Sequence, residues 1–319
     1  MLVFLLKRCL GAVILLVVMS FVTYGLIGLM PGDPIDLMVS GDPNLTPEDA
    51  ARLKALYGLD QPLMTRYWHW LQSALQGEFG FSRLKNQPVG AVMGQALAST
   101  LWLVIPAFVL ALGLAVPLGV WAARKPGGIA DQSINLFAFA GLSVPQFWLA
   151  ILLILTFAVT LGWLPASMPA GADGLRFASG LVLPVVTLAL LSSGGYVRFV
   201  RSAVIEELTR HHIRTARAKG VSEPAVLWRH ALRGALNPVI TVVGLGFGAL
   251  FSGALITETI FAMPGMGKLV YDAIMGNDYN LALVGLLLTT AMVLIGNLLA
   301  DIAYVALDPR IKLDGEADE

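Results

Sequence analysis

Long apolar stretches alternate with short polar segments along most of the chain. A helix needs about 20 apolar residues to cross a bilayer, and six runs reach that length. Because backbone N–H and C=O groups find no water in lipid, these runs are predicted to be helices. The predicted spans are residues 9–30, 99–122, 133–161, 178–197, 235–257 and 281–303. The pattern therefore predicts an all-α, polytopic membrane protein with six transmembrane helices.

Several prolines fall inside these runs or near their ends, namely Pro106, Pro117, Pro145 and Pro184. Membrane helices tolerate proline, because neighbouring groups satisfy the backbone atoms that it frees. Kinks are therefore expected at these positions, and a functional unwinding is an open alternative.

The distribution of basic residues predicts the orientation. With the N-terminus inside, the cytosolic segments hold 14 of the 21 Lys and Arg residues, whereas the short outer loops hold only Arg176 and Lys268. The positive-inside rule then places both termini in the cytosol and the long segment 31–98 outside. The predicted divisions are 1–30 with the first helix, 31–98, a core at 99–308 that includes a cytosolic loop at 198–234, and a cytosolic tail at 309–319.

The external segment carries its own helix signals. Thr46, Pro47 and Glu48 are typical of an N-cap followed by a proline and an early acid, and Gly58 is a suitable end. A second helix is predicted between Pro62 and Gly77, with its apolar residues on one face. This region is either an interfacial cap over the bundle or a surface that receives a soluble binding protein.

The third external loop, 258–280, contains Pro264-Gly265-Met266-Gly267-Lys268. This run resembles a phosphate-binding loop but lacks the required residues at Ala262 and Leu269. A turn followed by a short helix at 266–275 is predicted instead.

Composition supports the membrane class and narrows the chemistry. The chain of 319 residues is 57% hydrophobic and 13% charged, about half the charge of a typical soluble domain. Its formal net charge is zero, so nothing favours nucleic acid as a partner. The single cysteine, Cys9, excludes an intrachain disulfide and a cysteine metal cage.

No span carries a catalytic pair or a carboxylate near the midplane. Asp301 is the one ionisable residue within a run, and it is expected near the cytosolic interface as the partner of an arginine. Glu258 is expected at the external end of the fifth helix. A proton-coupled carrier would place an acid near the midplane, so the energy source is expected on another subunit.

The cytosolic loop 198–234 is more structured than a tether requires. A helix is predicted from about 202 to 218, with Gly220 as its C-terminal glycine and Ser222 as the cap of a second helix. The loop either lies on anionic lipid or binds a partner. Its small residues Ala216, Ala218 and Gly220 favour close approach by a partner.

At this loop the chain resembles the ABC importer permeases, and in particular the first permease subunit of the peptide/nickel (dipeptide/oligopeptide) family. The resemblance rests on Thr215-Ala216-Arg217-Ala218-Lys219-Gly220, on Arg229-His230-Ala231-Leu232-Arg233 and on Asn237-Pro238. Similar pieces lie along almost the whole chain, among them Pro31-Gly32-Asp33-Pro34, Ser143-Val144-Pro145-Gln146-Phe147-Trp148, Pro264-Gly265-Met266-Gly267 and Leu307-Asp308-Pro309-Arg310. The chain departs from the wider importer motif at Arg214-Thr215, where that motif has Glu-Ala, and it has the unusual pair His211-His212.

The resemblance implies a type I importer fold and a transport subunit that is not itself an enzyme. It implies a heterodimer with a second homologous permease, two cytosolic ABC ATPases that carry ATP and Mg²⁺, and an external substrate-binding protein, all in a bacterial inner membrane. This chain would bind no cofactor or metal. The residues implied to contact the ATPases are Arg214, Thr215, Ala216, Arg217, Ala218, Lys219, Gly220, Arg229, His230, Asn237 and Pro238.

Polar residues at membrane depth mark the predicted substrate pathway, and they are Asn135, Ser143, Gln146 and Asn297. Such residues either join helices or line a pore. Gly244 and Gly248 have the spacing of closely packed helices. The implied cargo is a di- or oligopeptide, with chelated nickel or another small peptide-like solute such as glutathione as alternatives. An ion-coupled secondary carrier is the remote alternative.

Overall fold

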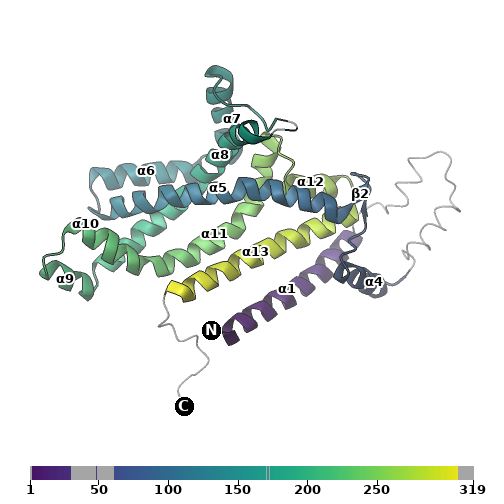
Figure 1. Ribbon diagram of the computed structural model, residues 1–319, viewed down its shortest axis with the longest axis horizontal. Helices are drawn as coiled ribbons and strands as arrows, with labels where there is room; N and C mark the ends of the chain where they lie inside the picture. The colour runs from purple at the N-terminus through teal and green to yellow at the C-terminus, as the bar shows by residue number, and fades with distance from the viewer. Residues whose placement is uncertain (1, 30–47, 49–60, 170, 172, 308–319) are drawn as a thin grey trace, which may run out of the picture. The chain divides into compact units, whose positions relative to one another are not determined.

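The computed structural model describes residues 2–29, 48, 61–169, 171 and 173–307, and these are largely helical (Figure 1). The chain divides into two compact units. Unit 1 comprises Met1–Arg8, Thr100–Met263 and Met292–Glu319, and unit 2 comprises Cys9–Ser99 and Pro264–Ala291.

The elements follow one another along the chain, and several helices extend well beyond the apolar runs. They are α1 (Leu2–Gly28), α4 (Leu63–Leu75), β1 (Phe81–Ser82), β2 (Gln87–Pro88), α5 (Val89–Ala123), α6 (Ile129–Ser143), α7 (Gln146–Leu153), the π-helix η1 (Ile154–Thr160), α8 (Gly174–Leu208), α9 (His211–Ala218), α10 (Glu223–Ala225), the π-helix η2 (Val226–Ala231), α11 (Leu232–Ile260), α12 (Met266–Met275) and α13 (Tyr279–Leu307).

Four helices of the described chain are long and apolar enough to cross a membrane: α1, α5, α8 and α13. Two bent pairs also reach the required length, and the count rises to six if each pair forms one span. The all-α polytopic class is confirmed, and the arrangement is compatible with the predicted six spans.

The predicted span 133–161 is not one continuous helix. The chain bends by 104° between α6 and the helix that begins at Gln146. Val144 has the extended conformation that a following proline favours, with φ −79° and ψ 126°. Pro145 has no N–H to continue the α6 ladder. The other three prolines behave differently, because Pro106, Pro117 and Pro184 lie inside helices.

The prediction of one cytosolic helix over 202–218 is wrong. Helix α8 continues from the membrane to Leu208, and α9 begins at His211 after a break at Thr209 and Arg210. At the break, the Thr209 hydroxyl donates to the carbonyl oxygen of Glu206 at 2.7 Å. The sequence pattern is amphipathic through this region, so hydrophobic spacing alone did not reveal the break.

Unit 2 contains the described part of segment 31–98, which is predicted to be external. Helix α4 begins after Pro62 and ends two residues before Gly77, and α12 occupies 266–275, so both predictions are confirmed. The helix predicted between Thr46 and Gly58 falls outside the described residues. The short antiparallel pair of β1 and β2 was not predicted. The Asp278 carboxylate accepts a hydrogen bond from the Ser82 hydroxyl at 2.6 Å and fixes this hairpin to the loop before α13.

Within unit 1, α8 packs against both α6 and α11. Helix α11 also approaches the unit 1 part of α13 closely. A Cβ atom at Gly244 would overlap the Cβ of Ala300, and one at Gly248 would lie 3.1 Å from Val293 Cγ1. The predicted packing role of these two glycines is confirmed, because a larger side chain would push the helices apart.

Candidate functional site

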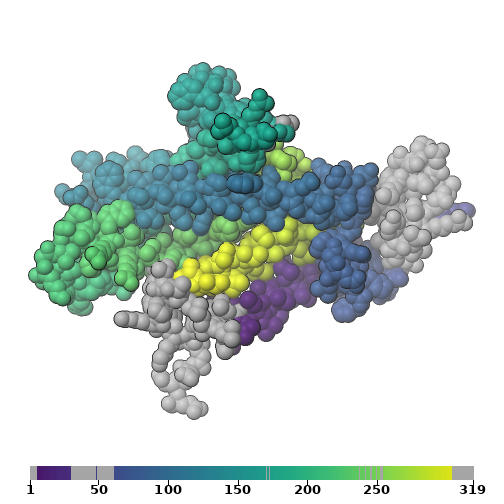
Figure 2. All heavy atoms as spheres, viewed as in Figure 1, coloured from purple at the N-terminus to yellow at the C-terminus, as the bar shows by residue number. Residues whose placement is uncertain are grey.

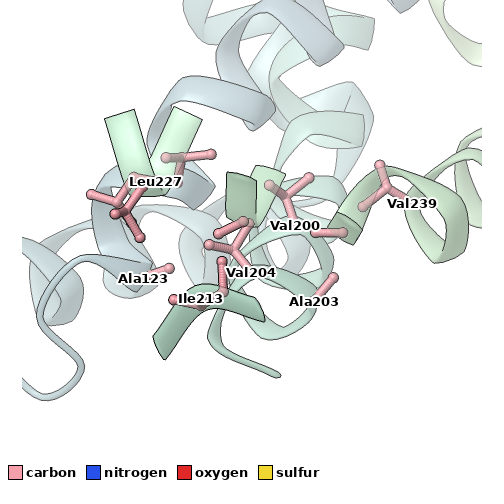
Figure 3. Close-up of a cluster of buried hydrophobic side chains, with 11 residues drawn as sticks. Ala123, Val200, Ala203, Val204, Ile213, Leu227 and Val239 are labelled. Carbon is pink, nitrogen blue, oxygen red and sulfur yellow. The ribbon is translucent and has the colours of Figure 1, made fainter. Parts of the chain in front are cut away.

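The segment from α9 to the start of α11, predicted to be cytosolic, has an apolar inner face. Ile213 of α9 and Val226 of η2 are completely buried, in one cluster with Val204 of α8. Figure 3 shows Ile213, Val204 and Leu227 converging in this cluster, with Ala123 from the end of α5 beside them. The segment is therefore anchored on the ends of the long helices by burial of apolar surface.

The outer face of the same segment is polar and basic. Its exposed residues include Arg214, Thr215, Arg217, Ala218, Lys219, Gly220 and Arg229. His230 is partly buried, and Trp228 is 49% exposed. In Figure 2 the green atoms of this segment lie on the surface. An apolar face held by the protein and a cationic face left open suit a docking element.

The turn between α9 and α10 is closed by two hydrogen bonds. Gly220 N–H donates to the Arg217 carbonyl at 3.0 Å, and Val221 N–H donates to the Ala216 carbonyl at 3.2 Å. This is the Schellman arrangement, which needs a left-handed residue after the helix end. Gly220 has φ +80° and supplies it, as predicted. An exposed bidentate pair of Arg217 and Glu223 spans the turn, with Nε to Oε1 at 2.8 Å.

Two details of the segment differ from the sequence-based expectation. Ala216 is buried, so its small side chain faces the protein's own interior and not a partner. Ser222 lies at the N-cap position of α10 but makes no side-chain capping hydrogen bond.

Asn237 and Pro238 lie in α11, which bends by 56° between Leu236 and Pro238. The side chain of Asn237 falls outside the described part of the structure.

A buried ion pair, missed from the sequence, joins α6 to α8 near the same end of unit 1. Arg201 donates to both carboxylate oxygens of Asp131, with Nη2 to Oδ2 at 2.7 Å. The Asp131 carboxylate also accepts from Gly127 N–H and from Asn135 Nδ2, each at 2.7 Å. Asp131 is only 3% exposed. The partners are 70 positions apart in the chain, so only the fold brings them together.

A cavity of about 430 Å³, largely open to the surface, lies between the bend of α6 and α7, helix α8 and helix α11. This volume falls within the range of about 300–1,000 Å³ that is usual for small-molecule sites. Its lining residues are Leu142, Gln146, Leu188, Leu191, Ser192, Gly195, Tyr196, Phe199, Val242, Gly246 and Leu250. Among these described residues none is charged, and the polar groups come from Gln146, Ser192 and Tyr196.

Of the four predicted pathway residues, only Gln146 lines this cavity. Its Nε2 atom also donates to the Thr257 hydroxyl of α11 at 2.6 Å. Asn135 is bound to Asp131, and Ser143 is exposed at the end of α6. The Oδ1 atom of Asn297 is buried and accepts no hydrogen bond from the described residues. The pathway roles of Asn135, Ser143 and Asn297 remain predictions.

The acids near the span ends have polar partners. Asp301 Oδ2 lies 3.3 Å from Arg8 Nε, which confirms the expected arginine partner. Glu258 is completely buried and accepts a hydrogen bond from the Thr100 hydroxyl at 2.6 Å. Both contacts join helices, and neither acid lines the cavity.

Two family models cover nearly the whole chain. The model of the binding-protein-dependent transport system inner membrane component matches residues 115–313, and the model of its N-terminal part matches residues 1–109. The chain belongs to this family. It is therefore a multi-pass inner membrane permease and not an enzyme, as the sequence predicted.

Curated relatives of the permease align over almost their full length. The oligopeptide transport system permease protein AppB of Bacillus subtilis (strain 168) is 35% identical over 317 residues, which cover 97% of this chain and 99% of AppB. The glutathione transport system permease protein GsiC of Escherichia coli (strain K12) is 35% identical over 312 residues, which cover 98% and 99% of the two chains. A putative peptide transport system permease protein of Brucella abortus (strain 2308) is 37% identical over 311 residues, covering 97% and 98%.

Solved structures show the same fold. The MetNI methionine ABC transporter in an inward-facing conformation superposes with a TM-score of 0.55 at 19% identity, covering 68% of the permease and 96% of the solved chain. An amino acid ABC transporter crystallised with histidines has a TM-score of 0.52 at 13% identity, covering 68% and 94%. The expected type I importer fold is confirmed.

Proposed function

We propose that this permease forms half of the translocation pathway of an ATP-driven importer of peptides. The second half would be a homologous permease subunit. Two ABC ATPases, which would carry ATP and Mg²⁺, would dock on the cytosolic segment 214–238, and an external binding protein would deliver the solute. Both chain termini would lie in the cytosol. The observation that carries the proposal is the form of this segment, because it has an apolar face anchored on α5, α8 and α11 and an open basic face.

The cavity supports a peptide as the solute. Its polar groups are an amide and two hydroxyls, which suit the hydrogen-bonding groups of a peptide backbone. Because none of the described lining residues is charged, the cavity should not strongly prefer peptides with particular side chains. The names of the relatives point the same way, since AppB and GsiC are described as permeases for oligopeptides and for glutathione. Glutathione, a tripeptide, is therefore the second candidate cargo.

The proposal is tested by purifying the chain in mild detergent after co-expression with its encoded transport partners. We expect two ATPases and a second permease to be recovered with it. In proteoliposomes, peptide uptake should require ATP and the loaded binding protein. Chelated nickel and glutathione serve as competing solutes. Recovery of the chain alone, or uptake driven by a proton gradient without ATP, would contradict the proposal and favour a secondary carrier.

We also predict that Gln146→Leu slows peptide uptake roughly tenfold, which corresponds to about 1.4 kcal/mol and is the size of one lost hydrogen bond. The change puts an apolar side chain of similar size in place of the amide that lines the cavity and donates to Thr257. Uptake rates at saturating binding protein measure the effect. Gln132→Leu is the control, because Gln132 lies in the same bent helix pair, is exposed and does not line the cavity. Equal uptake by both variants would remove Gln146 from the pathway.

A further inference from the structure

Glu207 is a buried acid at the point where the membrane helix α8 meets the cytosolic segment. It is the second-last residue of α8, and only 5% of it is exposed. The chain that follows it, from Arg210 to Arg214, is basic. The adjacent acid Glu206 has a side chain that is 76% exposed. A carboxylate is seldom buried to this extent unless other groups pair with it.

The Glu207 carboxylate holds the beginning of α9. Its Oε2 atom lies 3.0 Å from Nε of Arg210, which occupies the N-cap position of α9. Its Oε1 atom lies 3.3 Å from Nε2 of His212, in the first turn of α9. A negative charge at a helix N-terminus is also favoured by the helix dipole. These contacts stabilise the chain conformation at the break between α8 and α9.

The same carboxylate lies directly on the backbone of α11. A Cβ atom at Gly234 would overlap Oε1 of Glu207 and would come within 2.8 Å of its Cγ. A side chain larger than hydrogen at this position would have to displace the Glu207 side chain. One acid thus contacts the end of α8, the start of α9 and the first part of α11.

We propose that Glu207 is a positioning residue for transport, which makes α8 and α11 follow α9 when a bound ATPase displaces it. The proposal rests on the proposed docking role of segment 214–238. Glu207→Gln would remove the negative charge from this buried contact and so weaken its hold on Arg210 and His212, whose side chains are more than half exposed. With Glu207 neutral, α9 could move on its apolar support without moving both membrane helices. ATP would then be hydrolysed without the matching transport step.

The test uses the reconstituted importer with its ATPases and binding protein, and the readout is solute transported per ATP hydrolysed. We expect Glu207→Gln to lower this ratio roughly tenfold, within the range of about 5–150-fold for coupling between sites. Glu206→Gln is the matched control, because Glu206 lies beside it and reaches the same Arg210 at 3.6 Å from the exposed side. Its ratio should stay within about twofold of the wild type, as surface pairs contribute little. A normal ratio in Glu207→Gln overturns the proposal.

A second variant separates positioning from stability. Gly234→Ala keeps the charge but displaces the carboxylate, and it should also lower the ratio in the complexes that assemble. If both variants reduce only the amount of assembled complex while the ratio stays normal, Glu207 has a purely structural role and the proposal is wrong. The double variant Glu207→Gln, His212→Gln should be no less coupled than Glu207→Gln alone, since the two residues act through one contact. Additive losses would contradict that link.

Failure of this inference can be told from failure of the proposed function. Gly220→Pro disrupts the docking segment itself and is measured beside the other variants. If Gly220→Pro uncouples transport and Glu207→Gln does not, only the role of Glu207 is refuted. If neither uncouples transport, segment 214–238 is not the docking element.

Discussion

Replacing Gly220 with proline is expected to abolish coupled uptake while the chain still inserts into the membrane. Proline fixes φ near −65° and has no N–H, whereas Gly220 has φ +80° and donates to the Arg217 carbonyl. The Schellman turn between α9 and α10 therefore cannot form. A loss of about 3 kcal/mol would lower the population of the correctly placed α9 by more than a hundredfold. Uptake should fall at least tenfold, even if partner binding restores part of that population.

Two further substitutions at this position give graded controls. Gly220→Asn should transport nearly as well as the wild type, because asparagine enters the left-handed region more readily than other residues. Gly220→Ala should lie between them, at a cost of about 1 kcal/mol for the left-handed conformation, since no atom lies within 4 Å of the added Cβ. The measurements are uptake, ATPase rate with and without loaded binding protein, and the amount of permease in the membrane. Full coupling in the proline variant would show that the turn does not transmit the movement.

Replacing Asp131 with alanine is expected to cost about 3–5 kcal/mol of stability, as removal of one partner from a buried ion pair usually does. The Arg201 side chain is 24% exposed and keeps some access to water, which favours the lower end of this range. Gly127 and Asn135 also lose their shared acceptor. Thermal unfolding in detergent and the steady-state amount in the membrane measure the effect.

Glu223→Ala is the control for that experiment, since it breaks the exposed pair with Arg217. Surface pairs contribute about 0–1 kcal/mol, so its unfolding temperature should change little. Adding Arg201→Met to Asp131→Ala should recover much of the loss, because the unpaired charge is then removed. If Asp131→Ala is no more harmful than Glu223→Ala, the pair contributes little to holding α6 on α8.

Features that depend on neighbouring residues were predictable from the sequence. Apolar length gave the long helices, and the left-handed turn followed from Gly220 after a short amphipathic run. Features that depend on distant contacts were not. The break after Leu208 is accompanied by contacts of Glu207 with Arg210, His212 and the backbone at Gly234, and nothing in the local pattern shows that this acid is buried.

The candidate site was predicted only in part for the same reason. The basic outer face of segment 214–238 follows from its composition, but the inward position of Ala216 depends on how α9 rests on its support. Polar character at membrane depth singled out Gln146, which lines the cavity, but it could not show that Asn135 is held by Asp131 or that Ser143 is exposed. An acid near the start of α6 and an arginine late in α8 were the available signals for the ion pair.

The break at Pro145 has a consequence for how a solute is recognised. By helix geometry, the carbonyl groups in the last turn of α6 beyond Ala140 receive no hydrogen bond within that helix. Irregular backbone at membrane depth is tolerated where it is buried in protein or lines a water-filled cavity, and Leu142 and Gln146 on either side of the break line the cavity. Main-chain atoms present the same dipoles whatever residue approaches them. A pathway built on them would recognise the repeating amide of a cargo and be indifferent to its sequence.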